Sequence, residues 1–212
     1  MKIKWLGHAC FLITSARGTR ILTDPFDETV GYVVPAIEAD FVTVSHEHFD
    51  HNAVGNVKGK PKVVRGAGSH SLGDVTARGI DTFHDEAKGS KRGPNTVFVF
   101  DVDGMSVCHL GDLGHALAPG HATAIGKVDV LLVPVGGTYT IDSAGAANVV
   151  ERLDPRVVIP MHYKTDAMSF PIVGVEPFLQ RVGGGMRVGS TTVEIGKDDL
   201  VGQRKVYVLE YA

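Results

Sequence analysis

Short apolar runs recur along the whole chain, and this pattern constrains the fold more than any other feature of the sequence. The runs are rich in valine and isoleucine, which favours β-strands over helices. Gly, Pro, Asn and Asp separate them, as turns between strands require. The predicted strands are residues 3–6, 10–13, 41–44, 62–65, 96–100, 105–110, 130–135, 157–160, 191–195 and 206–209.

Two longer stretches have the signals of helices. Residues 142–153 begin with an aspartate that can cap a helix and continue with a stripe of Ala, Val and Leu. Residues 174–182 carry bulky apolar side chains, and shorter helices are expected after His51 and over residues 121–125. Many strands with about four helices predict an α+β fold of two sheets with helices packed outside them. No linker-like tract divides the chain, so we expect a single domain spanning residues 1–212.

The composition excludes several classes of protein. Of the 212 residues, 43% are hydrophobic and 21% are charged, with a net charge of −3. These values exclude disordered, collagen-like and coiled-coil chains, and they give no reason to expect a long nucleic acid as partner. The apolar runs are too short to span a membrane, and the N-terminus lacks the pattern of a signal peptide. Because Cys10 and Cys108 cannot form a disulfide framework, we expect reduced thiols and a cytoplasmic protein.

The strongest functional signal is the segment His46-Glu47-His48-Phe49-Asp50-His51, which directly follows a predicted strand. In an extended chain, side chains two residues apart point the same way, so His46 and His48 can converge on one ion. A turn at the strand end then brings Asp50 and His51 beside them, directed at a second ion. Imidazole nitrogens and carboxylate oxygens suit zinc, manganese or iron. A chance cluster of polar loop residues is the alternative, but the H-x-H-x-D-H spacing favours a metal site.

Two ions need more ligands than this segment supplies. His84, Asp112 and His162 each stand just after another apolar run. Any one of them alone would be interpreted as a strand-end residue that meets solvent, but together with the first motif they indicate metal ligands. His109 also stands at a strand end and is the alternative to His84 as the third histidine ligand.

These residues and their order resemble the metallo-β-lactamase-fold hydrolase superfamily. Asp24, in Thr23-Asp24-Pro25, is similar to the aspartate that braces the ligand loop in that family. The segments 109–115, 134–142 and 160–164 resemble a compact branch that includes ascorbate-6-phosphate lactonase-like proteins and, more distantly, the N-acyl phosphatidylethanolamine phospholipase D group. The resemblance implies a four-layer αββα sandwich.

The resemblance also implies seven metal ligands and two divalent ions. In that scheme the first ion is bound by His46, His48 and His84, the second by Asp50, His51 and His162, and both by Asp112. We expect zinc, with manganese or iron as the alternatives.

Two such ions could share a water molecule, lower its pKa towards neutrality and so supply hydroxide. Asp50 could orient this hydroxide and accept its proton. His109, where it is not a ligand, could donate a proton near the site. Because no activated serine or cysteine motif is present, we expect water to be the nucleophile.

Side chains that contact the substrate are expected on the loops beyond the strand ends. Tyr139 and Thr140 follow a glycine pair and could donate hydrogen bonds, and Lys164 could hold an anionic group. The charged, Gly-rich residues 85–93 predict a mobile loop whose Lys and Arg side chains face solvent, with contact to a phosphate as the alternative. His8 has no partner pattern; the resemblance places its predicted hairpin near the metal site, which leaves a substrate-side role open.

Three functions are consistent with these residues. The leading one is a binuclear metal-dependent hydrolase that uses a metal-bridging hydroxide on a small ester, lactone or phosphodiester. The second is a phosphodiesterase or nuclease, and the acidic balance of charge argues against long nucleic acids as its substrates. The third is a non-hydrolytic, iron-binding sensor or redox module on the same fold. We expect a small-molecule substrate in the leading case.

Overall fold

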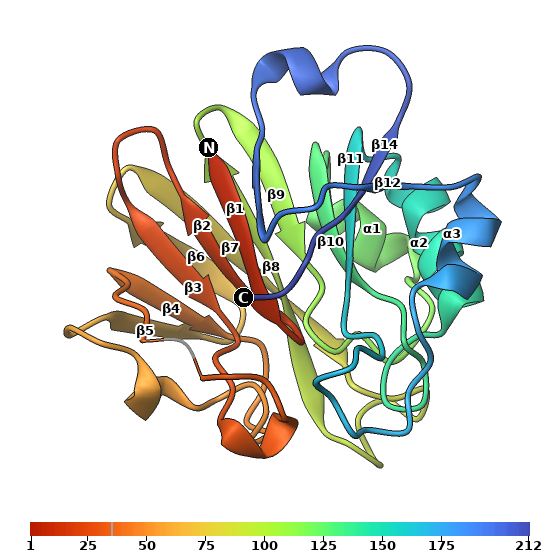
Figure 1. Cartoon of the computed structure of the whole chain (residues 1–212), viewed down its shortest axis with the longest axis horizontal. Coiled ribbons are helices and arrows are strands. Elements are labelled where there is room, and N and C mark those ends of the chain that lie inside the picture. Colours follow the sequence, from red (N-terminus) through yellow and green to blue (C-terminus); the bar gives the residue numbers. More distant parts are fainter. Residues whose placement is uncertain (35) are drawn as a thin grey trace.

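The strands form two sheets in a computed structural model that describes residues 1–34 and 36–212. The first sheet contains β1 (Lys2–Gly7), β2 (Cys10–Thr14), β3 (Arg20–Thr23), β4 (Phe41–Val44), β5 (Lys62–Arg65) and β13 (Thr192–Glu194), in the order β13-β1-β2-β3-β4-β5. Its strands β1–β5 are the red and orange arrows at the left of Figure 1.

The second sheet has eight strands. They are β6 (Gly68–Leu72), β7 (Val75–Phe83), β8 (Pro94–Val102), β9 (Met105–His109), β10 (Val130–Pro134), β11 (Val157–Met161), β12 (Met186–Arg187) and β14 (Lys205–Val208), in the order β12-β14-β11-β10-β9-β8-β7-β6. All ten predicted strands are therefore present. Strands β3, β6, β7 and β12 are not among those ten.

Three helices lie at the right of Figure 1: α1 (Pro119–Ile125), α2 (Ser143–Leu153) and α3 (Glu176–Val182). Helices α1 and α2 pack on the second sheet, and α3 packs against α2. The predicted capping role of Asp142 is confirmed, because its Oδ1 accepts hydrogen bonds from the backbone N–H groups of Ala144 and Gly145 at 3.1 and 2.8 Å. None of the helices in residues 1–34 and 36–212 is long and apolar enough to cross a membrane.

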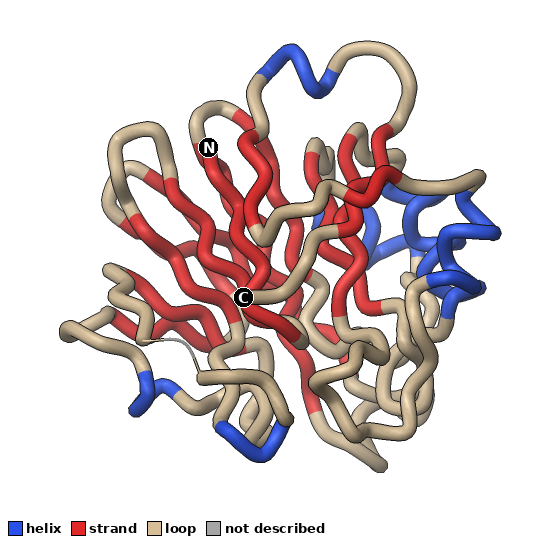
Figure 2. The backbone as a smooth tube through the Cα atoms, viewed as in Figure 1, coloured by secondary structure: helices blue, strands red, loops and turns tan. Residues whose placement is uncertain are grey.

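The outer face of the first sheet has a thinner cover. It consists of loops and the short 3-10 turns η1 (Glu28–Val30) and η2 (Val54–Asn56), seen as short blue segments at the lower left of Figure 2; a third turn, η3 (Lys197–Leu200), lies at the top. The helix expected after His51 is thus only η2. The expected layering of two sheets between outer elements is confirmed, with one outer layer reduced to turns and loops.

The alternation of side chains along each strand produces two apolar clusters. Trp5 and Phe11 of the first sheet and Phe98 and Phe100 of the second belong to one buried cluster that joins the sheets. Neighbouring positions such as Leu6 point to the other face of the first sheet and join a second cluster beneath the loop cover. Side chains two residues apart share a face of a strand, which explains this division.

The directions of the strands place all predicted ligands at one edge. Two successive antiparallel pairs give β1 and β3 the same direction, and β4 is parallel to β3. By the same reasoning β7, β9, β10 and β11 run in one direction. The loops that follow these strands lie along the lower edge of the molecule in Figure 1. Polar residues that follow these strands therefore meet between the two sheets.

Candidate metal centre

Six histidines gather at this edge in two groups of three. One group is His46, His48 and His84, and the other is His8, His51 and His162; within each group the potential ligand atoms lie within 4.8 Å of one another. Five of the six are predicted ligands. The sixth, His8, is the one that sequence reasoning left without a ligand role.

Asp112 lies between the two groups. Its Oδ2 is 3.3 Å from the Nε2 atoms of His84, His51 and His162, and 3.9 Å from that of His46. Asp50 lies beside the second group, with its Oδ2 3.8 Å from Nε2 of His51. The seven predicted ligands therefore share one small region of the molecule.

A single buried carboxylate orients one histidine in each group. Oδ2 of Asp24 accepts a hydrogen bond from Nδ1 of His51 at 2.9 Å and another from the Ser45 hydroxyl at 2.6 Å. Because that hydroxyl donates to Asp24, it accepts from Nδ1 of His46, 2.9 Å away. These bonds select the Nδ1–H tautomer of each neutral imidazole, whose Nε2 lone pair would face the site. Burial raises the pKa of Asp24, but the bond from His51 and the nearby histidines outweigh it and lower that pKa below its usual value.

Asn95 holds the loop that carries Asp112. Its side-chain oxygen accepts from the backbone N–H of Asp112 at 2.9 Å, while its Nδ2 donates to the Leu110 carbonyl at 3.0 Å and the Thr82 hydroxyl at 2.8 Å. Sequence reasoning missed this residue. An asparagine inside a strand gives no signal by itself, because its role depends on a neighbouring strand.

His109 lies outside both groups. Its Nε2 donates to the carbonyl of Ala9 at 2.8 Å, and its Nδ1 accepts from the backbone N–H of Gly111 at 3.2 Å. Both ring nitrogens are therefore used inside the fold. This leaves neither a lone pair for a metal nor a free proton for catalysis, the two roles that the sequence predicts for His109. The structure instead shows it tying the β1–β2 turn to the end of β9.

The donor atoms fit a divalent transition metal. Among the described residues, Nε2 of His46 and Oδ1 of Asp112 are buried without a hydrogen-bond partner, which is costly unless another group satisfies them. Burial and the neighbouring His51 lower the pKa of His46 to about 3. Neutral imidazoles beside ionised carboxylates are what such an ion needs.

A pocket of about 480 Å³ opens beside the first group. Its lining combines predicted ligands, aromatic rings and one arginine: Glu47, His48, Phe49, Asp50, His84, Arg92, Asp112, Tyr139 and Phe170. Phe49 is 56% exposed, so its ring faces solvent. The volume suits a small molecule.

The three predicted substrate-binding residues are placed differently. Tyr139 lines the pocket, and its ring lies 6.2 Å from that of Phe170. Thr140 is not part of the described lining, and its hydroxyl donates to the carbonyl of Ile141 at 3.1 Å. Lys164 lies in a different hollow, where its ammonium donates to the carbonyls of Met168 and Phe170. These bonds hold the loop of residues 164–170 and occupy the ammonium group that the sequence analysis expects to bind an anionic group of the substrate.

The glycine pair before Tyr139 has another purpose than close approach to a ligand. A Cβ atom on Gly136 would lie 2.3 Å from the carbonyl oxygen of His162, which accepts a hydrogen bond from the N–H of Gly136 at 3.0 Å. Glycine at this position therefore allows the loop after β10 to pack against the loop that presents His162.

Residues 85–93 form a compact turn rather than an open loop. The buried carboxylate of Asp85 accepts hydrogen bonds from four backbone N–H groups of this segment. The donors are Ala87, Gly89, Lys91 and Arg92, at 2.8, 3.0, 2.9 and 2.7 Å. The side chain of Arg92 lines the pocket and lies 5.6 Å from the Tyr139 ring centroid. The alternative of a substrate contact thus fits Arg92 better than a position in free solvent.

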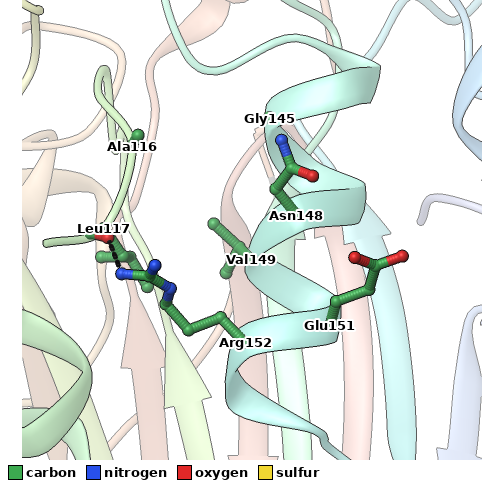
Figure 3. A pocket seen from close by; sticks show the side chains of 7 residues that line it. All are labelled: Ala116, Leu117, Gly145, Asn148, Val149, Glu151 and Arg152. Atoms are coloured by element: carbon green, nitrogen blue, oxygen red, sulfur yellow. Dashed lines mark hydrogen bonds between the residues drawn. The ribbon is translucent and has the colours of Figure 1, made fainter. Parts of the chain in front are cut away.

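Another pocket, of about 470 Å³, lies between α2 and residues 116–117 (Figure 3). Arg152 reaches across it and donates a hydrogen bond to the carbonyl of Leu117. None of the predicted site residues lines this pocket, and we assign it no part in the chemistry.

Comparisons with known proteins point to one family. The profile of a β-lactamase superfamily domain matches residues 2–162. A UPF0173 protein of Pyrococcus furiosus is 33% identical over 206 residues, which cover 81% of this chain and 87% of that protein. A UPF0173 metal-dependent hydrolase of Carboxydothermus hydrogenoformans is 31% identical over 211 residues, which cover 83% of this chain and 88% of that protein.

Solved structures show the same likeness. A crystal structure from Thermotoga maritima, of a proposed Zn-dependent hydrolase of the metallo-β-lactamase superfamily, has a TM-score of 0.84 and 43% sequence identity, and the match covers 100% of this chain and 99% of that chain. The fold and the family expected from the motifs are confirmed. This chain belongs to the β-lactamase superfamily and, within it, to the metal-dependent hydrolases.

Proposed function

We propose that residues 1–212 form one domain that hydrolyses a small ester, lactone or phosphodiester at a centre of two divalent metal ions. One observation carries this proposal. Oδ2 of Asp112 lies 3.3 Å from Nε2 of His84 in the first group and 3.3 Å from Nε2 of both His51 and His162 in the second. A carboxylate between two sets of imidazoles is the arrangement that two bridged ions require.

The same geometry supports the ligand set that the family resemblance implies. His46, His48 and His84 would hold the first ion, Asp50, His51 and His162 the second, and Asp112 both. His84 takes the third histidine position because His109 has no free ring nitrogen. The donor set favours zinc, with manganese and iron as alternatives. When bound, the ions would lower the pKa of a water molecule and polarise the substrate oxygen under attack.

The remaining roles belong to side chains of the pocket. The carboxylate of Asp50 lines the pocket and is 13% exposed, so it can accept a proton from the attacking water. Arg92 and Tyr139 form a cationic and aromatic wall that would bind an anionic, partly apolar substrate. The cavity volume of about 480 Å³ supports a small molecule as substrate.

Metal analysis followed by an activity screen tests this proposal. We expect protein purified without added metal to contain close to two equivalents of a transition metal and to hydrolyse a member of a panel of lactones, thioesters and phosphodiesters. His48→Ala should lose the first ion and the activity. A content below one equivalent that His48→Ala leaves unchanged would contradict the proposal.

A further inference from the structure

His8 is the one member of the two histidine groups without a role in the proposed centre. Its side chain is fully buried. Its Nε2 lies 3.1 Å from Nε2 of His51 and 3.2 Å from Oδ2 of Asp50. Both neighbours are assigned above to the second ion, so His8 points at the position of that ion.

The turn between β1 and β2 fixes this direction. His8 has a φ of 51°, a left-handed conformation that costs energy for a residue with a Cβ atom. Its carbonyl accepts from Nε1 of Trp5 at 3.0 Å and from the backbone N–H of His162 at 3.1 Å. The preceding Gly7 has a φ of 113°, and a Cβ there would lie 2.6 Å from the Tyr32 ring. The backbone is thus held on both sides, which fixes the direction of the Cα–Cβ bond of His8 towards the second group.

The neighbouring carbonyl adds a second anchor. The oxygen of Ala9 accepts from the Thr23 hydroxyl at 3.0 Å and from Nε2 of His109 at 2.8 Å. His109 therefore supports the turn that presents His8, which explains why a buried histidine stands at the end of β9 outside both groups.

The spacing of the donor atoms is that of ligands around one ion. In the neutral form of His51, Nδ1 donates to Asp24, so its Nε2 would offer a metal ion the lone pair on the side that faces Nε2 of His8. Two donors that each lie about 2.0–2.2 Å from one ion are roughly 3.0–3.4 Å apart when they are adjacent. The distances of 3.1 Å from His8 to His51, 3.2 Å from His8 to Asp50 and 3.3 Å from His51 to Asp112 fall in this range.

We propose that Nε2 of His8 is a ligand of the second metal ion, beside Asp50, His51, Asp112 and His162. This inference rests on the proposed two-metal function. It gives the second position five protein donors, whereas the first has the three histidines of its group and Asp112. A residue in the first ten of the chain thereby becomes part of a centre whose other members follow residue 45.

Cobalt titration of metal-free protein tests the proposal without an activity assay. The wild type should bind two equivalents of Co²⁺, each detected by its visible absorption. In His8→Ala the first equivalent should bind as in the wild type and the second at least about tenfold more weakly, the lower bound for loss of even an indirect metal partner. His8→Gln keeps an N–H donor of similar reach, and we expect the same loss. His70→Ala, on the edge strand β6, is the matched histidine control and should bind both equivalents normally.

Three outcomes separate the hypotheses. If both His8 variants bind the second equivalent with wild-type affinity, His8 is not a ligand. If His8→Gln alone restores that affinity, His8 acts by donating a hydrogen bond to Asp50, and the ligand role is wrong. If the wild type itself binds a single equivalent, the two-metal function fails first. Circular dichroism of each variant shows whether a lost equivalent reflects a lost fold.

Discussion

The two histidine groups differ in how the fold encloses them. His48 and His84 of the first group line the pocket and meet whatever enters it. The three histidines of the second group are at most 1% exposed, and none of them is in the described lining of that pocket. The first group is thus the side that a substrate of the proposed hydrolase would meet, and the second is enclosed by the core. Substitutions in the two groups should therefore have different costs.

The largest expected effect is at Asp112, the residue that the two groups share. Asp112→Asn keeps the shape and removes the charge, so we expect the affinity for both ions to fall by more than about 100-fold, beyond the usual range for an indirect metal partner. Hydrolysis should become undetectable. Isothermal titration with Zn²⁺ measures the loss. If one ion still binds with wild-type affinity, Asp112 serves a single group and the picture of a shared carboxylate is wrong.

Asp24 tests whether one buried carboxylate supports both groups. Asp24→Asn leaves His51 and, through Ser45, His46 without their oriented partner, and we expect about 10–100-fold weaker binding of both ions. Ser45→Ala is the matched control, because it removes the hydroxyl between Asp24 and His46 and leaves the direct bond from His51 to Asp24 in place. Titration of Ser45→Ala should show a larger loss of affinity for the first ion than for the second. An equal loss of affinity for the two ions in Ser45→Ala would contradict the view that Ser45 connects Asp24 to the first group alone.

The stability of the metal-free protein tests the contrast between the buried second group and the first group, which lines the pocket. His51→Ala removes a buried hydrogen bond and leaves the buried Asp24 carboxylate with only its bonds from Ser45, which should cost about 1–3 kcal/mol of unfolding free energy. His48→Ala removes a partly exposed side chain, so we expect a change within about 0.5 kcal/mol. Urea unfolding with a chelator present compares the two. Equal losses would show that both groups are equally embedded in the core.

The smallest expected effect is at Arg92, in the wall of the pocket. Arg92→Ala removes the cation beside Tyr139, and we expect KM for an anionic substrate to rise roughly tenfold, the equivalent of about 1.4 kcal/mol. Metal content should not change. Lys91→Ala, the exposed neighbour, should leave KM unaltered. A lower metal content in Arg92→Ala would place this residue in the centre rather than in the substrate wall.

Most of the strands and the ligand motif of residues 46–51 could be predicted because both depend on local sequence. Apolar runs marked the strands, and polar residues just after them marked His84, Asp112 and His162. The same rule applies to His8, which follows β1 directly, but a tight hairpin is also the ordinary place for a polar residue. Whether His8 belongs to the metal centre or is an ordinary turn residue depends on the direction of β1 relative to β7 and β11, which the sequence alone does not give.

Other features depend on contacts that no local pattern reports. Asn95 supports Asp112 from a neighbouring strand, and Lys164 is engaged by carbonyls four and six residues further along a loop. Strand β6 was missed because Gly68-Ser69-His70-Ser71-Leu72 is largely polar. It lies at the edge of its sheet beside β7, where burial does not demand apolar side chains.

The hydrogen bond from the backbone of His162 to the carbonyl of His8 joins the first turn of the chain to a loop three-quarters of the way along it. Contacts between segments so distant in sequence form late in folding, because a long loop must close first. During synthesis the second histidine group therefore cannot form until β11 and His162 have been made. Metal uptake should follow the docking of the two sheets and stabilise the folded chain.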